Sequence, residues 1–283
     1  MSAVGFVVAG LAVAALALLV LAGLRSADQR AERAEWRRLQ ALQPPAPAVF
    51  SAALVAELPE PARRYFGYAI RPGTALHRVA EIDMHGRIGL GTRAQPGYRR
   101  MQARQILAAP AGFVWAMNTR GGVPISGSDA GGWTRFRLLG LIPIARIGGN
   151  PDHARSAFGR QVAEAVFWTP AALLPGPGVS WQALGPDRAC VTVQHGRWQQ
   201  AVEVGVDADG RPVEVVFQRW SNANRERRYR LQPFGGRLAD FREVDGFRLA
   251  HRVDAGNLYG TPDYFAFFQV EVSAIRFVRA RAP

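Results

Sequence analysis

Asp83 and His85 are the first residues whose types and spacing suggest chemistry. They stand two residues apart in a segment with strand-like alternation, so both side chains face one side, as two ligands of a metal ion would. No third ligand follows at a spacing known from metal sites, and the other histidines are His77, His153, His195 and His251. The sequence therefore favours structural or surface histidines and predicts neither a metal nor a cofactor.

Several further patterns resemble functional motifs but lack the necessary context. Residues 89–91 begin like a glycine-rich dinucleotide loop, yet no helix follows whose N-terminus would hold a phosphate. Residues 207–210 begin like a calcium loop without its distal glutamate, and a tight turn explains them. Ser126 and Ser128 lie near Asp129, but no serine or cysteine occupies a nucleophile elbow. Catalysis is left uncertain, and a protein without catalytic residues is favoured.

Two polar residues are expected to have structural roles. Glu164 stands among apolar neighbours four residues after Arg160, which predicts an ion pair along one helix face and disfavours a general acid. Cys190 is the only cysteine, so no internal disulfide can form. Its apolar neighbours predict a buried thiol.

Large apolar side chains give the clearest signal of function, because they exceed what scattered surface positions need. The residues concerned are Trp115, Trp133, Phe136, Trp168, Leu173, Leu174, Phe217 and Trp220. They either fill an ordinary core or line a hydrophobic cleft beneath a curved sheet. Prolines flank Leu173 and Leu174, so residues 168–175 are expected to form a wall or lid of such a cleft.

An uncharged segment opens the chain and predicts a membrane anchor. As a helix, residues 1–24 would reach about 36 Å, enough to cross a hydrocarbon core of about 30 Å. No basic residue precedes this run, so an uncleaved span, with residues 3–24 in the bilayer, is favoured over a secretory signal. A juxtamembrane helical stalk and Pro-rich linker follow over residues 25–47, with Trp36 expected to pack on the domain. Residues 48–283 are predicted to be a single β-rich domain.

The net charge of +13 would suit nucleic acid or anionic lipid. Every basic residue is arginine, which is typical of a GC-rich genome, and the arginines are dispersed, so no nucleic-acid partner is expected. Anionic headgroups beside the anchor are the nearer partner. The arginines that follow the span favour a cytoplasmic domain on a single-pass protein of a bacterial inner membrane; they are Arg25, Arg30, Arg33, Arg37 and Arg38.

From residue 76 onward the chain consists of short alternating segments separated by turn residues, which is typical of strands. Residues 202–217 predict one hairpin around the turn at residues 207–210. Residues 241–253 predict another, around Asp245-Gly246. Residues 264–277 are predicted to be the last strand and to close the sheet.

Two helical regions are expected to pack on this sheet. The first covers residues 49–70, where Pro61 fits the first turn of a new helix. The second covers residues 156–174, with Phe158 and Val162 on its apolar face. The predicted fold class is α+β: an N-terminal transmembrane helix, then one domain with a curved antiparallel half-barrel sheet packed on a few helices.

Five stretches carry a family resemblance: residues 58–66, 102–105, 112–115, 138–143 and 163–175. On these, the chain resembles an uncharacterised bacterial domain family over residues 57–277. The family has no known function, so the resemblance implies no reaction and no catalytic residue. The order of elements is also similar to that of the periplasmic lipoprotein carriers, whose half-barrel sheet leaves an apolar cavity for acyl chains. This similarity favours the periplasmic side, against the arginine count, and leaves the orientation open.

The sequence thus favours a membrane-tethered, non-catalytic module that binds a lipid or another apolar ligand. Two alternatives remain. One is a structural or partner-binding envelope protein, with a filled core and an exposed patch. The other is a hydrolase with an unrecognised site.

Overall fold

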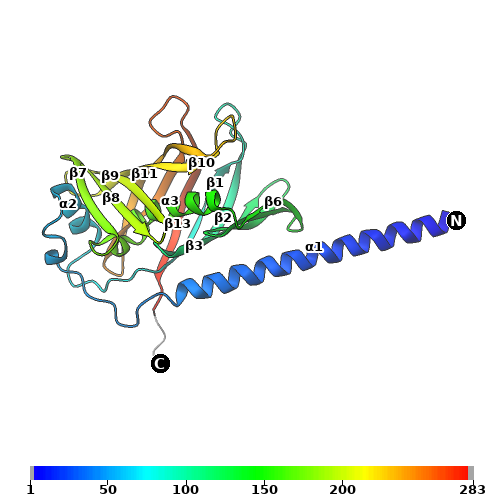
Figure 1. Ribbon diagram of the computed structural model, residues 1–283, viewed down its shortest axis with the longest axis horizontal. Helices are drawn as coiled ribbons and strands as arrows, with labels where there is room; N and C mark the ends of the chain where they lie inside the picture. The colour runs from blue at the N-terminus through cyan, green and yellow to red at the C-terminus, as the bar shows by residue number, and fades with distance from the viewer. Residues whose placement is uncertain (1–2, 280–283) are drawn as a thin grey trace.

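The computed structural model describes residues 3–279 and begins with one unbroken helix, α1 (Ala3–Gln40). The first half of α1 projects away from the rest of the molecule (Figure 1). Its apolar side chains are exposed. Its most apolar window has a mean hydropathy of 2.8, and within the described residues it is the one helix long and apolar enough to cross a membrane. The expected N-terminal apolar helix is therefore present.

A single antiparallel sheet of 13 strands forms the body of the domain. Its strands are β1 (Ala80–Gly89), β2 (Tyr98–Ala108), β3 (Gly112–Arg120), β4 (Ile125–Ala130), β5 (Trp133–Leu138), β6 (Ile142–Gly148), β7 (Val179–Gly185), β8 (Arg188–His195), β9 (Trp198–Val206), β10 (Pro212–Ser221), β11 (Arg230–Val244), β12 (Phe247–Asn257) and β13 (Phe265–Phe277). The sheet is strongly curved, with one concave face and one convex face (Figure 1). We call these the inner and the outer face.

The chain builds this sheet as two meanders. Strands β1 to β6 run outward to one edge, the chain crosses to the opposite edge, and β7 to β13 return. The final strand β13 then pairs with β1, with Ala80 opposite Phe277. The prediction that the last strand closes the sheet is therefore wrong: β13 joins the two meanders in the middle, and the sheet stays open at β6 and β7.

The crossing between the two edges is made by helix α3 (Pro151–Trp168), followed by the short 3-10 helix η2 (Pro170–Leu173). Helix α3 starts five residues before the predicted position, because Asn150 accepts a hydrogen bond from the Asp152 backbone N–H at 2.8 Å and Pro151 occupies the first turn. The curved sheet surrounds α3, and its second half is buried on nearly every side.

The main core lies on the inner face, between α3, the sheet and a second small helical region. This region contains η1 (Ala52–Val55) and α2 (Glu60–Ala69), with Pro61 in the first turn as predicted. From α2, the buried Tyr65 hydroxyl donates to the Val166 carbonyl at 2.7 Å. The helices and the sheet thus form one hydrophobic unit.

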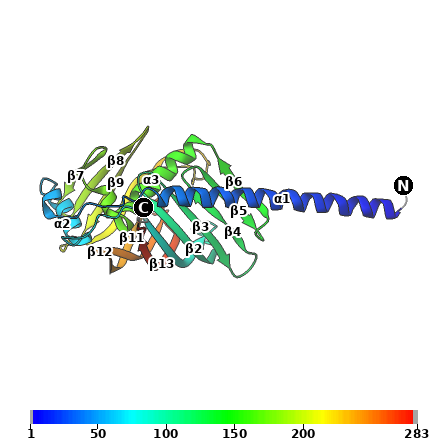
Figure 2. The same ribbon diagram turned by 90° about the horizontal axis from the view of Figure 1, so that it is seen from below.

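A second, smaller core lies on the outer face, beneath the second half of α1. Leu39 is fully buried there against Ile106, Val114 and Ala130 of the strands. Trp36 packs beside this cluster, and its Nε1 donates to Glu81 Oε1 at 2.9 Å, as expected for a residue that contacts the domain. Figure 2 shows α1 crossing the strands before it leaves the domain. We refer to this cluster as the outer core.

Both predicted hairpins are confirmed. Strands β9 and β10 are joined by a turn in which Gly210 N–H donates to the Asp207 carbonyl at 2.9 Å. Strands β11 and β12 are joined by Asp245 and Gly246, both with positive φ, as a tight two-residue hairpin requires.

Candidate ligand-binding cavity

A cavity of about 230 Å³ lies on the inner face, between α3 and strands of both meanders. Its walls are mainly apolar, and the aromatic residues among them are Trp115, Phe136, Phe167, Trp168, Phe217, Phe234, Phe267 and Phe268. Several of these rings support one another: Trp115 meets Phe136 and Phe268 edge-on, with centroids 6.2 Å apart in each pair. Aromatic walls of this kind present a rigid apolar surface to a ligand.

Four of the eight residues predicted to bind a ligand meet at this cavity: Trp115, Phe136, Trp168 and Phe217. They come from β3, β5, α3 and β10, so only the folded sheet brings them together. Trp168 is fully buried, and its Nε1 donates to the Ala250 carbonyl at 3.1 Å. That bond fixes its ring as one wall.

The structure does not bring the other four to the cavity. Leu173 and Leu174 belong to the inner core beside it, where Trp181 Nε1 donates to the Leu173 carbonyl at 2.9 Å. Trp133 lies on the outer face, against the outer core. Trp220 packs beside the start of α3, and its Nε1 donates to Asp152 Oδ1 at 2.8 Å.

A substitution of Leu173 tests the distinction between residues that line the cavity and residues that only pack in the core beside it. Leu173→Ala is expected to destabilise the protein by about 2–5 kcal/mol, because it empties a buried site among packed neighbours. Ligand retained per folded molecule should stay unchanged, since Leu173 is not in the cavity wall. Denaturant unfolding and lipid analysis of the same preparation measure both quantities. Loss of ligand with little loss of stability would place Leu173 at the ligand instead.

One end of the cavity is polar and centres on Arg160 of α3. Its guanidinium contacts Glu164 at 2.6 Å and Asp129 at 2.9 Å, so the predicted ion pair with Glu164 is present. Gln105 completes the cluster by accepting from Arg160 and donating to Glu164 at 2.6 Å. Burial would raise the pKa of Asp129, but His153, Arg160 and Thr134 together hold it below its ordinary value. Two carboxylates thus face one guanidinium at Arg160.

Thr134 and His153 extend this cluster in a way that resembles part of a catalytic triad. The Thr134 hydroxyl lies 2.8 Å from His153 Nε2 and 2.5 Å from Asp129 Oδ1. Asp129 lies nearest the same histidine nitrogen, Nε2, at 3.4 Å. A nucleophile relay needs the acid on one ring nitrogen and the hydroxyl on the other. The arrangement therefore serves as a hydrogen-bonded support for Asp129.

Arg219 of β10 is a second arginine of the cavity wall, and its surroundings differ from those of Arg160. Its Nε donates to Ser156 Oγ at 3.1 Å, and its guanidinium lies 5.0 Å over the Phe234 ring. No carboxylate within the described chain lies within 4.0 Å of it. Burial, with repulsion from Arg160, lowers the pKa of Arg219 to about 10, although the more distant carboxylates of Asp129 and Glu164 act in the opposite direction. The group still carries a positive charge at neutral pH, without an ion-pair partner.

Sequence reasoning missed Arg219, although a signal was available. Val215, Phe217 and Arg219 alternate along one strand and so share its inner face. Predicting Phe217 as a ligand-binding residue therefore implied Arg219 as well.

Comparison with known proteins places the chain in a family. A model described as "Family of unknown function (DUF6544)" matches residues 48–270. The chain belongs to DUF6544. No curated protein matches it.

Solved structures with a similar fold include the LolA superfamily protein NE2245 from Nitrosomonas europaea, with a TM-score of 0.40 and 12% identity over 83% of this chain and 96% of that one. Another is a putative outer membrane lipoprotein-sorting protein domain from Vibrio parahaemolyticus, with a TM-score of 0.37 and 13% identity over 80% and 91% of the two chains. In this chain the predicted curved antiparallel sheet is present, and it is open at β6 and β7.

The remaining motifs have structural roles in this DUF6544 chain. Asp83 pairs with Arg276 at 2.5 Å, and His85 lies exposed, 3.5 Å from Glu271. Across residues 3–279, no group of three or more potential ligands could hold a metal ion. Cys190 is buried, and burial raises the pKa of its thiol, which disfavours the reactive thiolate.

Proposed function

We propose that the inner cavity binds a lipid with one slender hydrocarbon chain and an acidic head. The observation that carries this proposal is a cavity with aromatic walls whose polar end holds an arginine without a carboxylate partner. Such a site matches the two parts of an amphipathic acid, with the tail among the rings and the head at Arg219.

The size and lining of the cavity support the choice of tail. Small-molecule sites commonly enclose roughly 300–1,000 Å³. A space of about 230 Å³ is slightly smaller and suits a narrow chain better than a bulky ring system. The aromatic and aliphatic walls offer a hydrocarbon the favourable transfer from water that drives such binding.

The electrostatics support the choice of head. Arg160 already has Glu164 and Asp129, so an incoming anion would find its free donors on Arg219. A partly buried guanidinium gains more from an anion than an exposed one does, because water screens the pair less. Carboxylate and phosphate oxygens both match its planar donors.

The first experiment tests whether the inner cavity holds a ligand. The full chain is purified in mild detergent, its organic extract is analysed by mass spectrometry, and displacement of a fluorescent fatty acid is measured. Ala163→Phe places a ring into the cavity from α3 and is expected to abolish displacement and extracted lipid. Ala154→Phe, on the same helix but outside the cavity wall, is the control and should retain both. Equal behaviour of the two variants would contradict the proposal.

The second experiment tests the head of the ligand. Arg219→Met keeps much of the side-chain length and removes the charge. We expect it to weaken displacement by palmitate about tenfold, since a hydrogen bond to a charged group contributes about 1.5–3 kcal/mol. Displacement by methyl palmitate, which carries no charge, should not change. A loss for both ligands, or for neither, would show that Arg219 does not recognise an acidic head.

A further inference from the structure

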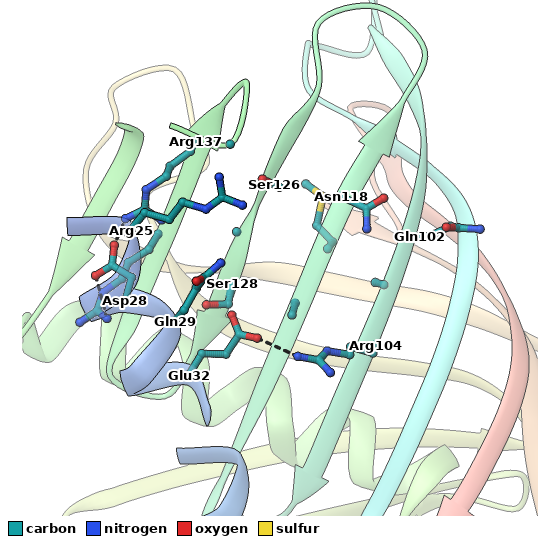
Figure 3. Close-up of a pocket in the computed structure, with 16 residues that line it drawn as sticks. Arg25, Asp28, Gln29, Glu32, Gln102, Arg104, Asn118, Ser126, Ser128 and Arg137 are labelled. Atoms are coloured by element: carbon teal, nitrogen blue, oxygen red, sulfur yellow. Dashed lines mark hydrogen bonds and ion pairs between the residues drawn. The ribbon is translucent and has the colours of Figure 1, made fainter. Parts of the chain in front are cut away.

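The outer face carries a second, polar cleft that the proposed function does not use. It lies between α1 and strands β2 to β5, has a volume of about 370 Å³, and is distinct from the inner cavity. Figure 3 shows Arg25, Asp28 and Glu32 of α1 directed toward this cleft, with Arg137 and Arg104 on the strands beside it. We refer to it as the outer cleft.

The outer cleft has an excess of positive charge. Its lining includes four arginines, Arg25, Arg104, Arg135 and Arg137, and two carboxylates, Asp28 and Glu32. Glu32 is paired with Arg104 at 3.1 Å. Asp28 alone faces Arg135 at 3.1 Å, Arg146 at 2.5 Å and Arg137. One carboxylate thus neutralises only part of the charge of three guanidinium groups.

Unused donors accompany this excess charge. Three guanidinium groups carry more N–H donors than one carboxylate can accept. Arg137 is buried, and its Nε has no hydrogen-bond partner. Arg25 has no ion pair with any carboxylate that the structure describes. Proximity of Arg146 adds to the effect of burial and lowers the pKa of Arg135 and of Arg137. An anion in the cleft would meet several of these donors at once.

The position of the cleft identifies the source of that anion. Arg25 is the first charged residue after the apolar half of α1, and its side chain lies against Gly140 in the turn between β5 and β6. If the apolar half of α1 spans a bilayer, the cleft opens where the helix leaves it. Exposed apolar residues lie in this turn and at the start of β6: Leu139, Ile142 and Ile144. A surface with arginines beside exposed aliphatic side chains suits the headgroup region of a membrane.

We propose that the outer cleft binds the headgroup of an anionic phospholipid from the bilayer that holds α1, with the β5–β6 turn resting on that bilayer. The phosphate would take the spare donors of Arg25, Arg135 and Arg137, and the acyl chains would follow the apolar half of α1. This site is independent of the ligand in the inner cavity.

Native mass spectrometry of the full chain, released from nanodiscs with equal parts of phosphatidylglycerol and phosphatidylcholine, tests the proposal. All variants carry Ala163→Phe, so that lipid in the inner cavity does not contribute. We expect retained phosphatidylglycerol to exceed phosphatidylcholine several-fold and Arg25→Gln to reduce it about tenfold, as expected for a lost charge-assisted hydrogen bond. Arg30→Gln removes an exposed arginine of the same helix that does not line the cleft, and should have no such effect.

Equal retention of the two lipids, or an equal loss in both variants, would overturn the proposal. Arg25 and Arg30 are exposed, so both variants should unfold at the temperature of the parent. Stabilisation of the lipid-free chain in detergent by inorganic phosphate alone, with no lipid preference in nanodiscs, would identify a free anion as the ligand and would also overturn it.

A second measurement tests whether the β5–β6 turn contacts the bilayer. An environment-sensitive dye is attached to Leu139→Cys or to Leu184→Cys in a Cys190→Ser background. Leu139 is 60% exposed near the anchor, and Leu184 is 47% exposed at the opposite edge of the sheet. We expect a blue shift in phosphatidylglycerol vesicles for the dye at residue 139 alone. The same spectrum at both positions would show that the turn does not touch the bilayer.

Discussion

Asp28→Asn is expected to destabilise the protein by about 3–5 kcal/mol, the range for removing one partner of a buried ion pair. Asp28 is 5% exposed, and its carboxylate is the shared partner of Arg135, Arg137 and Arg146. Asparagine keeps the shape but not the charge, so the three cations would repel one another with no anion among them. Urea unfolding of the full chain in mild detergent, followed by tryptophan fluorescence, measures the loss.

Glu35→Gln provides the matched control for this prediction. Glu35 is a carboxylate on the same helix, paired with Arg38 at 2.7 Å in a more exposed position. Its loss should cost less than about 1 kcal/mol, as is usual for ion pairs near the surface. If Asp28→Asn costs no more than Glu35→Gln, the arginine cluster does not fasten α1 to the sheet.

Removing residues 1–43 is expected to destabilise the domain far more than removing residues 1–24. The shorter deletion takes away only the exposed apolar half of α1. The longer deletion also removes Leu39 and Asp28, which uncovers the outer core and leaves the arginine cluster without its anion. These losses are worth about 2–5 and 3–5 kcal/mol, comparable to the roughly 5–15 kcal/mol of a typical domain.

The comparison is made by thermal unfolding and by binding of a dye that reports exposed apolar surface. The chain from residue 25 should unfold cooperatively, whereas the chain from residue 44 should bind the dye and aggregate. A synthetic peptide of residues 25–43 added to the longer deletion should reduce dye binding by covering the outer core again. Equal unfolding temperatures for the two deletions would mean that the second half of α1 is dispensable for the fold.

These two predictions depend on features that the sequence suggested only in part. Hydropathy was sufficient to find the apolar half of α1, because that signal is local. The burial of Asp28 has no local signal, because its arginine partners follow it by more than 100 residues. Arg25, Asp28, Glu32 and Leu39 do share one helical face, but that spacing does not identify which strands it meets.

The sheet shows the same division between local and long-range information. Hairpins with clear turns, such as the one at Asp245 and Gly246, were predictable because their strands adjoin in sequence. The pairing of β1 with β13 joins residues almost 200 positions apart and has no local signature. For that reason the sequence predicts that the last strand closes the sheet, whereas the strand lies in the middle of an open one.

The cavity residues divide along similar lines. Trp133 and Phe136 were both expected at the ligand, yet residues three apart in a strand point to opposite faces. Phe136 faces the cavity, and Trp133 faces the outer core. Alternation alone shows that Trp133 and Phe136 cannot both face the ligand, but only the fold shows which face of the sheet encloses the cavity.

Helix α1 has no break between Ala3 and Gln40, and its second half is fastened to the sheet along residues 28–39. A domain attached in this way has no flexible linker, so it cannot reorient freely relative to the helix or travel between membranes. If the first half spans a bilayer, the second half reaches only about 24 Å beyond it. Any cargo of the inner cavity would then have to be received and handed over at that membrane surface, by partners that come to it.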